Sequence, residues 1–149
     1  MILTACGGFL LAVLWMDLMF DVQVLGHRDG ELPVPVLDSI GAYYRRVTTT
    51  ARPMTHLVGT VMAIAIGTLV VQIARDDERR GIALLSLLLA GAPIALAMAR
   101  TYPNAVRLGA GSDPAAEQSR LARAICRDHV LCLVAIVAFV ALQIATAMR

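Results

Sequence analysis

Four long runs of apolar residues constrain this chain more than any other feature of its sequence. They cover about residues 2–25, 54–74, 81–99 and 130–148, and only the first contains an acidic or basic residue other than histidine. A helix of about 20 apolar residues is long enough to cross roughly 30 Å of hydrocarbon. With 58% hydrophobic and 16% charged residues, the composition is also too apolar for a typical soluble domain. We therefore predict an all-α fold: a single integral membrane domain, residues 1–149, built as an antiparallel four-helix bundle.

The segments between these runs predict two further helical features. From 35 to 50, apolar residues recur at helical spacing with Asp38 and Arg45 among the polar residues between them. This pattern predicts an interfacial amphipathic helix that lies on the membrane surface between the first two spans. Asp113 and Pro114 are typical of a helix start, with a capping carboxylate followed by proline. Because no glycine or proline follows Pro114, the fourth helix is expected to extend from about residue 114 into the membrane.

The distribution of arginine predicts the orientation of the bundle. Four spans place both termini on one side of the membrane and the two long loops on the other. All thirteen basic residues are arginine, and nine of them lie on the side of the long loops. Basic residues in short loops mark the cytoplasmic side. We therefore expect a multi-pass protein of the cell inner (plasma) membrane of a bacterium, with both termini on the non-cytoplasmic side.

Two aspartates interrupt the first apolar run. Asp17 and Asp21 are four residues apart, so on a helix they share one face. A charged side chain inside an apolar span costs about 3 kcal/mol on insertion scales, so it normally faces protein or a wet cavity and has a partner. For Asp17, a polar site inside the bundle and a place at the interface remain equally open. For Asp21, we favour an interfacial anchor for a loop arginine.

The topology brings other polar residues to the depth of these aspartates. The end of the first span, the start of the second, the end of the third and the start of the fourth all meet on the side of the long loops. A candidate site is therefore expected there, in a polar cavity between the helices. For each histidine, a structural hydrogen bond is the alternative interpretation. The candidates for proton handling and catalysis are Asp17 and His129, and the candidates for binding are Asp21, His56, Asn104 and Arg107.

The chain lacks the motifs of most cofactor-dependent enzymes. No Walker loop, dinucleotide glycine fingerprint or G-x-S-x-G elbow is present, so the cofactor is left unassigned. The Glu-x-x-His pair of di-metal bundles is also absent, and no metal site is predicted. Because no basic patch has interleaved aromatic residues, nucleic acid is not expected as a partner.

Two segments resemble a known family. YPNAVRL follows the third apolar run, and RLARAICRDHVLCLVAIVAF leads through an arginine-rich approach into the fourth. Together they resemble the anthrone-oxygenase-like family of small four-helix membrane proteins. The matching positions are Pro103, Asn104 and His129. This resemblance implies oxidation of polycyclic aromatic substrates without a tightly bound cofactor.

Two functional hypotheses remain, and whether the chain is an enzyme stays open between them. In the first, which we slightly favour, the cavity binds or oxidises an apolar aromatic or quinone-like small molecule. In the second, the chain is a non-catalytic accessory subunit that docks to and stabilises a larger membrane complex, or pairs with copies of itself. The second hypothesis rests on the projecting fourth helix and on small residues repeated every four positions, as at Gly59, Ala63 and Gly67, which allow helices to approach closely.

Overall fold

The computed structural model describes residues 1–27, 29–75 and 80–148 and confirms the all-α fold class. No strand occurs among these residues, and two of the short elements, η2 and η3, are π-helical turns, whereas η1 is a 3-10 helix. The elements in chain order are α1 (Ile2–Asp21), η1 (Val22–Gly26), α2 (Val34–Arg45), η2 (Arg46–Thr50), α3 (Arg52–Arg75), α4 (Arg80–Leu96), η3 (Ala97–Thr101), α5 (Tyr102–Ala110) and α6 (Ala115–Ala147).

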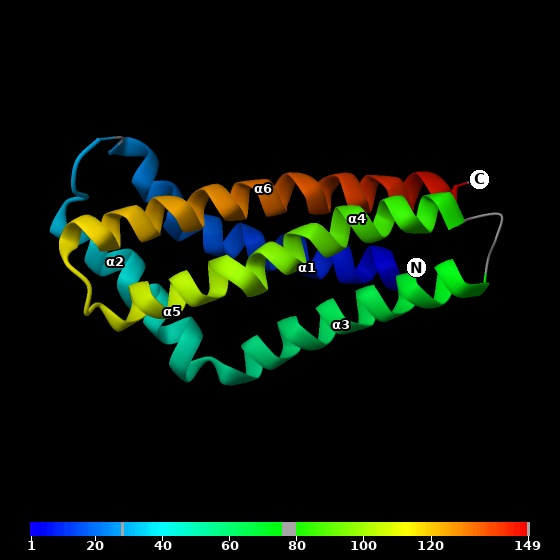
Figure 1. Ribbon diagram of the computed structural model, residues 1–149, viewed down its shortest axis with the longest axis horizontal. Helices are drawn as coiled ribbons and strands as arrows, with labels where there is room; N and C mark the ends of the chain where they lie inside the picture. Colours follow the sequence, from blue (N-terminus) through cyan, green and yellow to red (C-terminus); the bar gives the residue numbers. More distant parts are fainter. Residues whose placement is uncertain (28, 76–79, 149) are drawn as a thin grey trace.

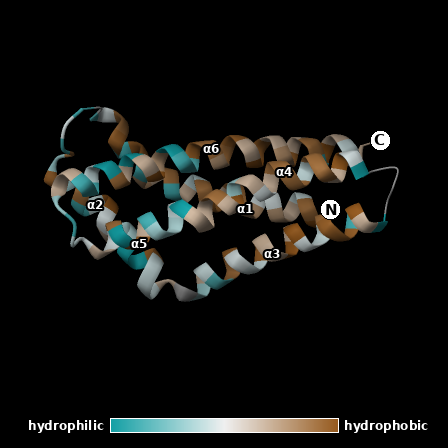
Figure 2. Ribbon diagram, viewed as in Figure 1, coloured by the Kyte–Doolittle hydropathy of each residue, from teal (hydrophilic) through white to brown (hydrophobic). Residues whose placement is uncertain are grey.

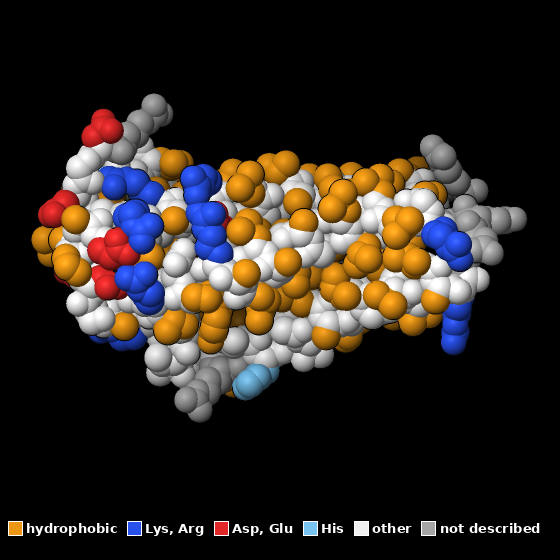
Figure 3. All heavy atoms as spheres, viewed as in Figure 1, with side chains coloured by type: hydrophobic (Ala, Val, Ile, Leu, Met, Phe, Trp, Pro, Cys, Tyr) orange, Lys and Arg blue, Asp and Glu red, His pale blue; other side chains and the backbone are white. Residues whose placement is uncertain are grey.

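The long helices run side by side along the long axis of the molecule (Figure 1). Four segments are long and apolar enough to cross a membrane: Ile2–Gly26, Pro53–Arg75, Arg80–Ala110 and Ala115–Ala147. Both chain termini lie at one end of the bundle, which we call the terminal end (Figure 1). The helices α2 and α5 lie at the other end, which we call the capped end. Hydrophilic residues are frequent at the capped end (Figure 2), and charged side chains gather there on the face seen in Figure 3, whereas apolar side chains cover most of the remaining length of that face.

Each of these two regions has its own hydrophobic core. In the bundle, α1, α3, α4 and α6 contribute the buried residues Leu3, Leu10, Ala65, Leu69, Ala90, Ile136 and Phe139. The second core fills the capped end between η1, α2, α5 and the first turns of α6. Its buried residues are Val24, Leu32, Leu37, Ile40, Tyr44, Ala105, Leu108, Leu121, Ala122, Ile125 and Cys126.

The third span continues further than the sequence predicts. The sequence predicts the third span over 81–99, and η3 and α5 carry the helical path beyond it to Ala110. Pro103 lies in the first turn of α5, where its missing N–H leaves no intrahelical bond unmade. The π-helical turn before it contains one longer backbone bond, from Tyr102 N to Ala97 O. Such a turn shifts the register of the hydrogen bonds without breaking the helix.

The helix predicted over 35–50 corresponds to α2 and η2, and its apolar face lies against protein. Leu37, Ile40 and Tyr44 are buried in the core of the capped end, where α2 packs on α5 and α6. The backbones of α2 and α5 meet at Gly109. A methyl group placed on Gly109 would lie 2.7 Å from the backbone nitrogen of Arg45. Only glycine fits at this crossing without displacing backbone.

The fourth helix, α6, runs without a break from Ala115 to Ala147. Its N-cap residue is Pro114 and no side chain caps it, so the predicted capping role of Asp113 is wrong. The carboxylate of Asp113 instead accepts a hydrogen bond from Arg107, at 3.1 Å. A guanidinium from α5 is a stronger partner for this carboxylate than a backbone N–H.

Candidate functional site

Five polar side chains from three helices meet where α1 passes into the capped end. His129 of α6 lies between the two aspartates of α1, with its Nδ1 2.6 Å from Asp21 Oδ2 and its Nε2 3.9 Å from Asp17 Oδ2. Two tyrosines of α2 complete the group: the hydroxyl of Tyr43 donates to Asp17 Oδ1 and that of Tyr44 to Asp21 Oδ1, each at 2.6 Å. We call these five residues the polar cluster. Its members join α1, α2 and α6.

The polar cluster satisfies its own hydrogen-bonding groups. Each of the four carboxylate oxygens of Asp17 and Asp21 faces a hydroxyl or an imidazole nitrogen within the cluster. The side chain of Asp21 is fully buried, and 15% of the Asp17 side chain is exposed. A buried carboxylate is tolerated only when it is paired and hydrogen-bonded in this way. Three of the four oxygens accept a hydrogen bond or lie 2.6 Å from a ring nitrogen, whereas Asp17 Oδ2 has only the longer 3.9 Å contact with His129, so the arrangement ties α1, α2 and α6 together.

Both tyrosines are held in the neutral, donating form. Burial raises the pKa of Tyr43, and the neighbouring Asp17 carboxylate raises it further. The pKa of Tyr44 is raised well above its usual value by burial and then by Asp21. The ring of Tyr43 also stacks on Phe20 of α1, with centroids 4.1 Å apart. Neither tyrosine was among the predicted site residues, although Tyr44 shares the helical spacing of Leu37 and Ile40.

A second charged pair lies near the cluster and was also missed. Asp128 is fully buried, and the nearest cation is Arg100, whose Nε lies 3.1 Å from Asp128 Oδ2. Within the described residues, neither carboxylate oxygen receives a well-aligned hydrogen bond. Arg100 follows the third apolar run and Asp128 precedes the fourth, so the two residues are 28 positions apart in the sequence and become neighbours only when the chain folds. No local sequence pattern therefore indicated this pair.

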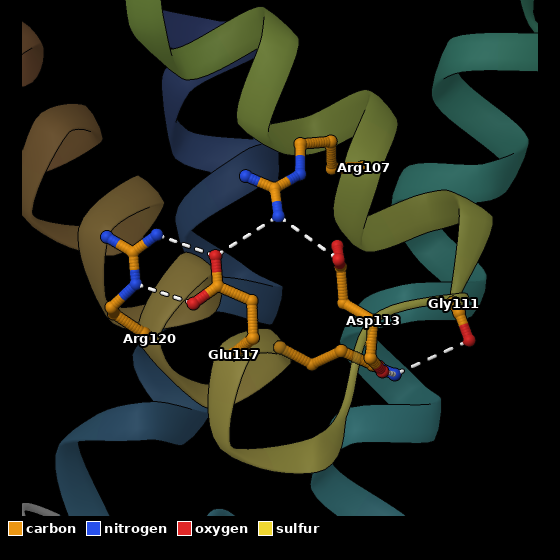
Figure 4. A network of polar contacts seen from close by, with 6 residues as sticks. Arg107, Gly111, Asp113, Glu117 and Arg120 are labelled. Carbon is orange, nitrogen blue, oxygen red and sulfur yellow. Dashed lines mark hydrogen bonds and ion pairs between the residues drawn. The ribbon is translucent and has the colours of Figure 1, made fainter.

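Exposed ion pairs close the turn between α5 and α6 (Figure 4). Arg107 reaches both Asp113 and Glu117 at 3.1 Å, and Glu117 is also paired with Arg120, at 2.6 Å. These groups lie at the surface, where solvent and salt screen such pairs. Arg107 therefore fixes the approach to α6 and is not brought to the polar cluster.

The sequence profile of the SHR3 chaperone family, described as ER membrane protein SH3, matches residues 1–147. The chain belongs to the SHR3 chaperone family. None of the curated proteins and none of the solved structures is significantly similar to it.

Membership of the SHR3 chaperone family corrects two predictions. The predicted relation to the anthrone-oxygenase-like family is wrong, because the SHR3 match covers nearly the whole chain whereas that resemblance rested on two short segments. The predicted location in a bacterial inner (plasma) membrane is also wrong, since the SHR3 family consists of ER membrane proteins of eukaryotes. Hydropathy does not distinguish these membranes. The predicted side of the membrane for the two termini rests on the distribution of arginine alone.

In this SHR3-family chain, the other binding candidates do not join the polar cluster. His56 is exposed on α3 and, among the described residues, has no hydrogen bond or ion pair with either aspartate. Asn104 is half-buried on α5. The topology predicts only the depth of both residues along the long axis of the bundle. Depth does not fix the direction in which a side chain points.

No group of three or more histidine, cysteine, aspartate or glutamate side chains is placed to hold a metal ion in the part of the chain that the structure describes. A groove with a volume of about 400 Å³ does occur, between η1 and α6. Its lining contains Val24 and Arg123 but no member of the polar cluster. The groove and the cluster are therefore separate features of this end of the bundle.

Proposed function

We propose that the chain is a non-catalytic chaperone of membrane proteins, which holds a transmembrane helix of a client against the outer face of α3. Membership of the SHR3 chaperone family supports a chaperone function. The polar cluster supports a non-catalytic one, because its carboxylates are occupied by partners from the same chain. The proposal of aromatic oxidation rested on a family resemblance that the SHR3 match replaces.

The observation that carries the proposal is the small-residue stripe of α3. Gly59, Ala63 and Gly67 are exposed, and a Cβ added at either glycine would meet no atom within 4 Å. Gly91 of α4 differs, since a Cβ placed there would lie 3.8 Å from the side chain of Ile66 on α3. The stripe of α3 is therefore unpartnered, and α3 is also the least buried of the four candidate spans.

Such a stripe suits the task of a membrane chaperone. Helices in lipid gain nothing from burying apolar surface, so they associate through close packing and hydrogen bonds. A groove of small residues lets another helix approach closely, and this mode does not depend on its exact sequence. Contacts of this kind are individually weak, which allows a client to be released. Under this proposal, the polar cluster serves to hold α1, α2 and α6 together while α3 receives the client.

Photo-crosslinking in ER-derived microsomes tests the proposal. A photoreactive residue at position 59 or 67 should crosslink to the transmembrane segments of newly made polytopic proteins, whereas one at Val134, exposed on α6, should not. Replacing both Gly59 and Gly67 by leucine should abolish the crosslinks and increase the aggregated fraction of those clients. The matched control is Gly8→Leu, at an exposed glycine of α1 with equally open surroundings.

Three outcomes would contradict the proposal. One is unchanged client solubility in the double leucine variant. Another is equal crosslinking from α3 and from Val134. The third is a crosslink from α3 to a second copy of the chain in place of a client, which would identify the stripe as a self-association surface.

A further inference from the structure

The groove between η1 and α6 combines an apolar surface with basic residues. Leu25 of η1 and Val130 and Leu131 of α6 supply exposed apolar side chains to its lining. Arg127 and Arg123 lie along the same groove, about one turn and two turns before Val130 on α6. The groove therefore presents one apolar part and one cationic part in sequence along the helix.

This change from basic to apolar coincides with the expected edge of the hydrocarbon. From Val130 to Met148, α6 contains no charged residue, whereas charged residues are frequent in the turns before it. Leu25 ends the first apolar run, just before the polar segment that starts at His27. The apolar part of the groove is thus at the depth of acyl chains, and Arg127 is at the depth of lipid phosphates.

The two arginines keep their positive charge available. Arg123 donates to the carbonyl oxygens of His27, at 2.9 Å, and Gly30, at 2.8 Å, and these are neutral acceptors. Arg127 lies 3.9 Å from Asp128, but that carboxylate is closer to Arg100, at 3.1 Å. Among the described residues, no other acidic side chain is paired with either arginine. The groove therefore has an excess of positive charge.

We propose that this groove binds one anionic phospholipid of the surrounding bilayer, with its phosphate on Arg127 and an acyl chain along Leu25, Val130 and Leu131. The arginine guanidinium matches phosphate in shape and charge. Arg123 shapes the wall of the groove, because it fastens the segment after η1 to α6. The apolar lining and the nearby cations together select an amphiphile with a negative head group, in preference to a neutral lipid or to a free anion.

Native mass spectrometry of the full chain tests the proposal, after reconstitution with equimolar phosphatidic acid and phosphatidylcholine. The wild type should retain one phosphatidic acid molecule preferentially. Arg127→Gln should lower this retention about fivefold, since one arginine near a charged bilayer surface contributes about that factor. The matched control is Arg46→Gln, which removes an exposed arginine at the same end, outside the groove lining.

A second variant tests the apolar part. Val130→Trp fills the groove and keeps both arginines, so it should also reduce lipid retention, which a purely electrostatic attraction would not do. Thermal unfolding of each variant checks that the fold is kept. Equal losses in the Arg127 and Arg46 variants would overturn the proposal, as would equal retention of the two lipids. Displacement of the lipid by inorganic phosphate at millimolar concentration would also overturn it, because the site would then be specific for free phosphate.

Discussion

The capped end and the open bundle hold their helices together by different means. At the capped end, buried polar side chains contact one another across α1, α2 and α6, and the backbones of α2 and α5 touch at Gly109. In the bundle, the core is a column of aliphatic side chains around Phe139, and α3 leaves its glycine stripe without a neighbour. The first kind of packing fixes one geometry, because it fails if any partner moves. The second kind tolerates small shifts of its helices, and under the proposed function the exposed face of α3 binds the client.

The largest difference between the two regions should appear when the buried ion pair is broken. Asp21→Ala removes the partner of both His129 and Tyr44. Without Asp21, the buried Nδ1 of His129 and the hydroxyl of Tyr44 lose their partner, and each buried polar group left unsatisfied costs about 1–3 kcal/mol, or about 2–6 kcal/mol for the two. Denaturant unfolding in detergent micelles should show a loss of this size. The control is Asp38→Ala, at an exposed aspartate of α2, which should leave the unfolding free energy almost unchanged. Equal effects of the two substitutions would mean that the polar cluster contributes nothing.

Matched glycine substitutions compare the regions directly. At Gly109, alanine would push its methyl group into the backbone of Arg45, so we expect a loss of about 1–3 kcal/mol, typical of overpacking. At Gly59, the same change meets open space and should be neutral or stabilising by up to about 1 kcal/mol, because alanine favours helix. The same unfolding assay measures both. If Gly59→Ala were the more harmful of the two, the distinction between a fixed and a tolerant region would be wrong.

Much of the fold could be predicted from the sequence, because hydropathy and turn residues act locally. Four apolar runs were enough for the helix bundle, and the absence of breakers after Pro114 was enough for the unbroken α6. The continuation of the third span past 99 was not predictable in this way. Pro103 indicates a helix end by ordinary rules, whereas the π-helical turn before it packs against α6, which no local pattern encodes.

The site was predictable only where one helix determined the geometry. The spacing of Asp17 and Asp21 places them on one face, and topology places His129 at their depth. The rotation of α2 about its own axis, which turns Tyr43 and Tyr44 toward those aspartates, depends on contacts with α5 and α6 that no local pattern contains. The family resemblance failed for a related reason. An arginine-rich approach to an apolar helix is a general requirement of membrane insertion, so it does not distinguish one family from another.

Alkaline pH should weaken the capped end through Tyr44. Burial and Asp21 raise the pKa of Tyr44 in the folded protein, whereas in the unfolded chain it should ionise near the usual value of about 10. Below that pH both states keep the proton, and stability does not depend on this group. Above it the unfolded state loses the proton first, so the free energy of unfolding should fall by up to about 1.4 kcal/mol per pH unit.

The substitution Tyr44→Phe isolates the contribution of the Tyr44 hydroxyl to the pH dependence of stability. Tyr44→Phe should be less stable than wild type at pH 8, because Asp21 loses a hydrogen-bond donor. Its stability should then fall less steeply between pH 10 and 11, as followed by circular dichroism of the purified chain. Parallel pH profiles of the two proteins would show that Tyr44 does not keep its proton in the folded state.

The smallest effect is expected for a hydrogen bond between two side chains that links α4 and α6 inside the bundle. Gln143 of α6 donates to the hydroxyl of the buried Ser86 at 2.8 Å. Hydrogen bonds between transmembrane helices contribute on average only about 0.6 kcal/mol, because a freed polar group finds another partner in the membrane. Ser86→Ala should therefore reduce the unfolding free energy by about that amount, and Ser112→Ala, at an exposed position between α5 and α6, provides the baseline. A loss from Ser86→Ala as large as that from Asp21→Ala would mean that the bundle, like the capped end, is held together by polar contacts. The distinction between a fixed capped end and a tolerant bundle would then be wrong.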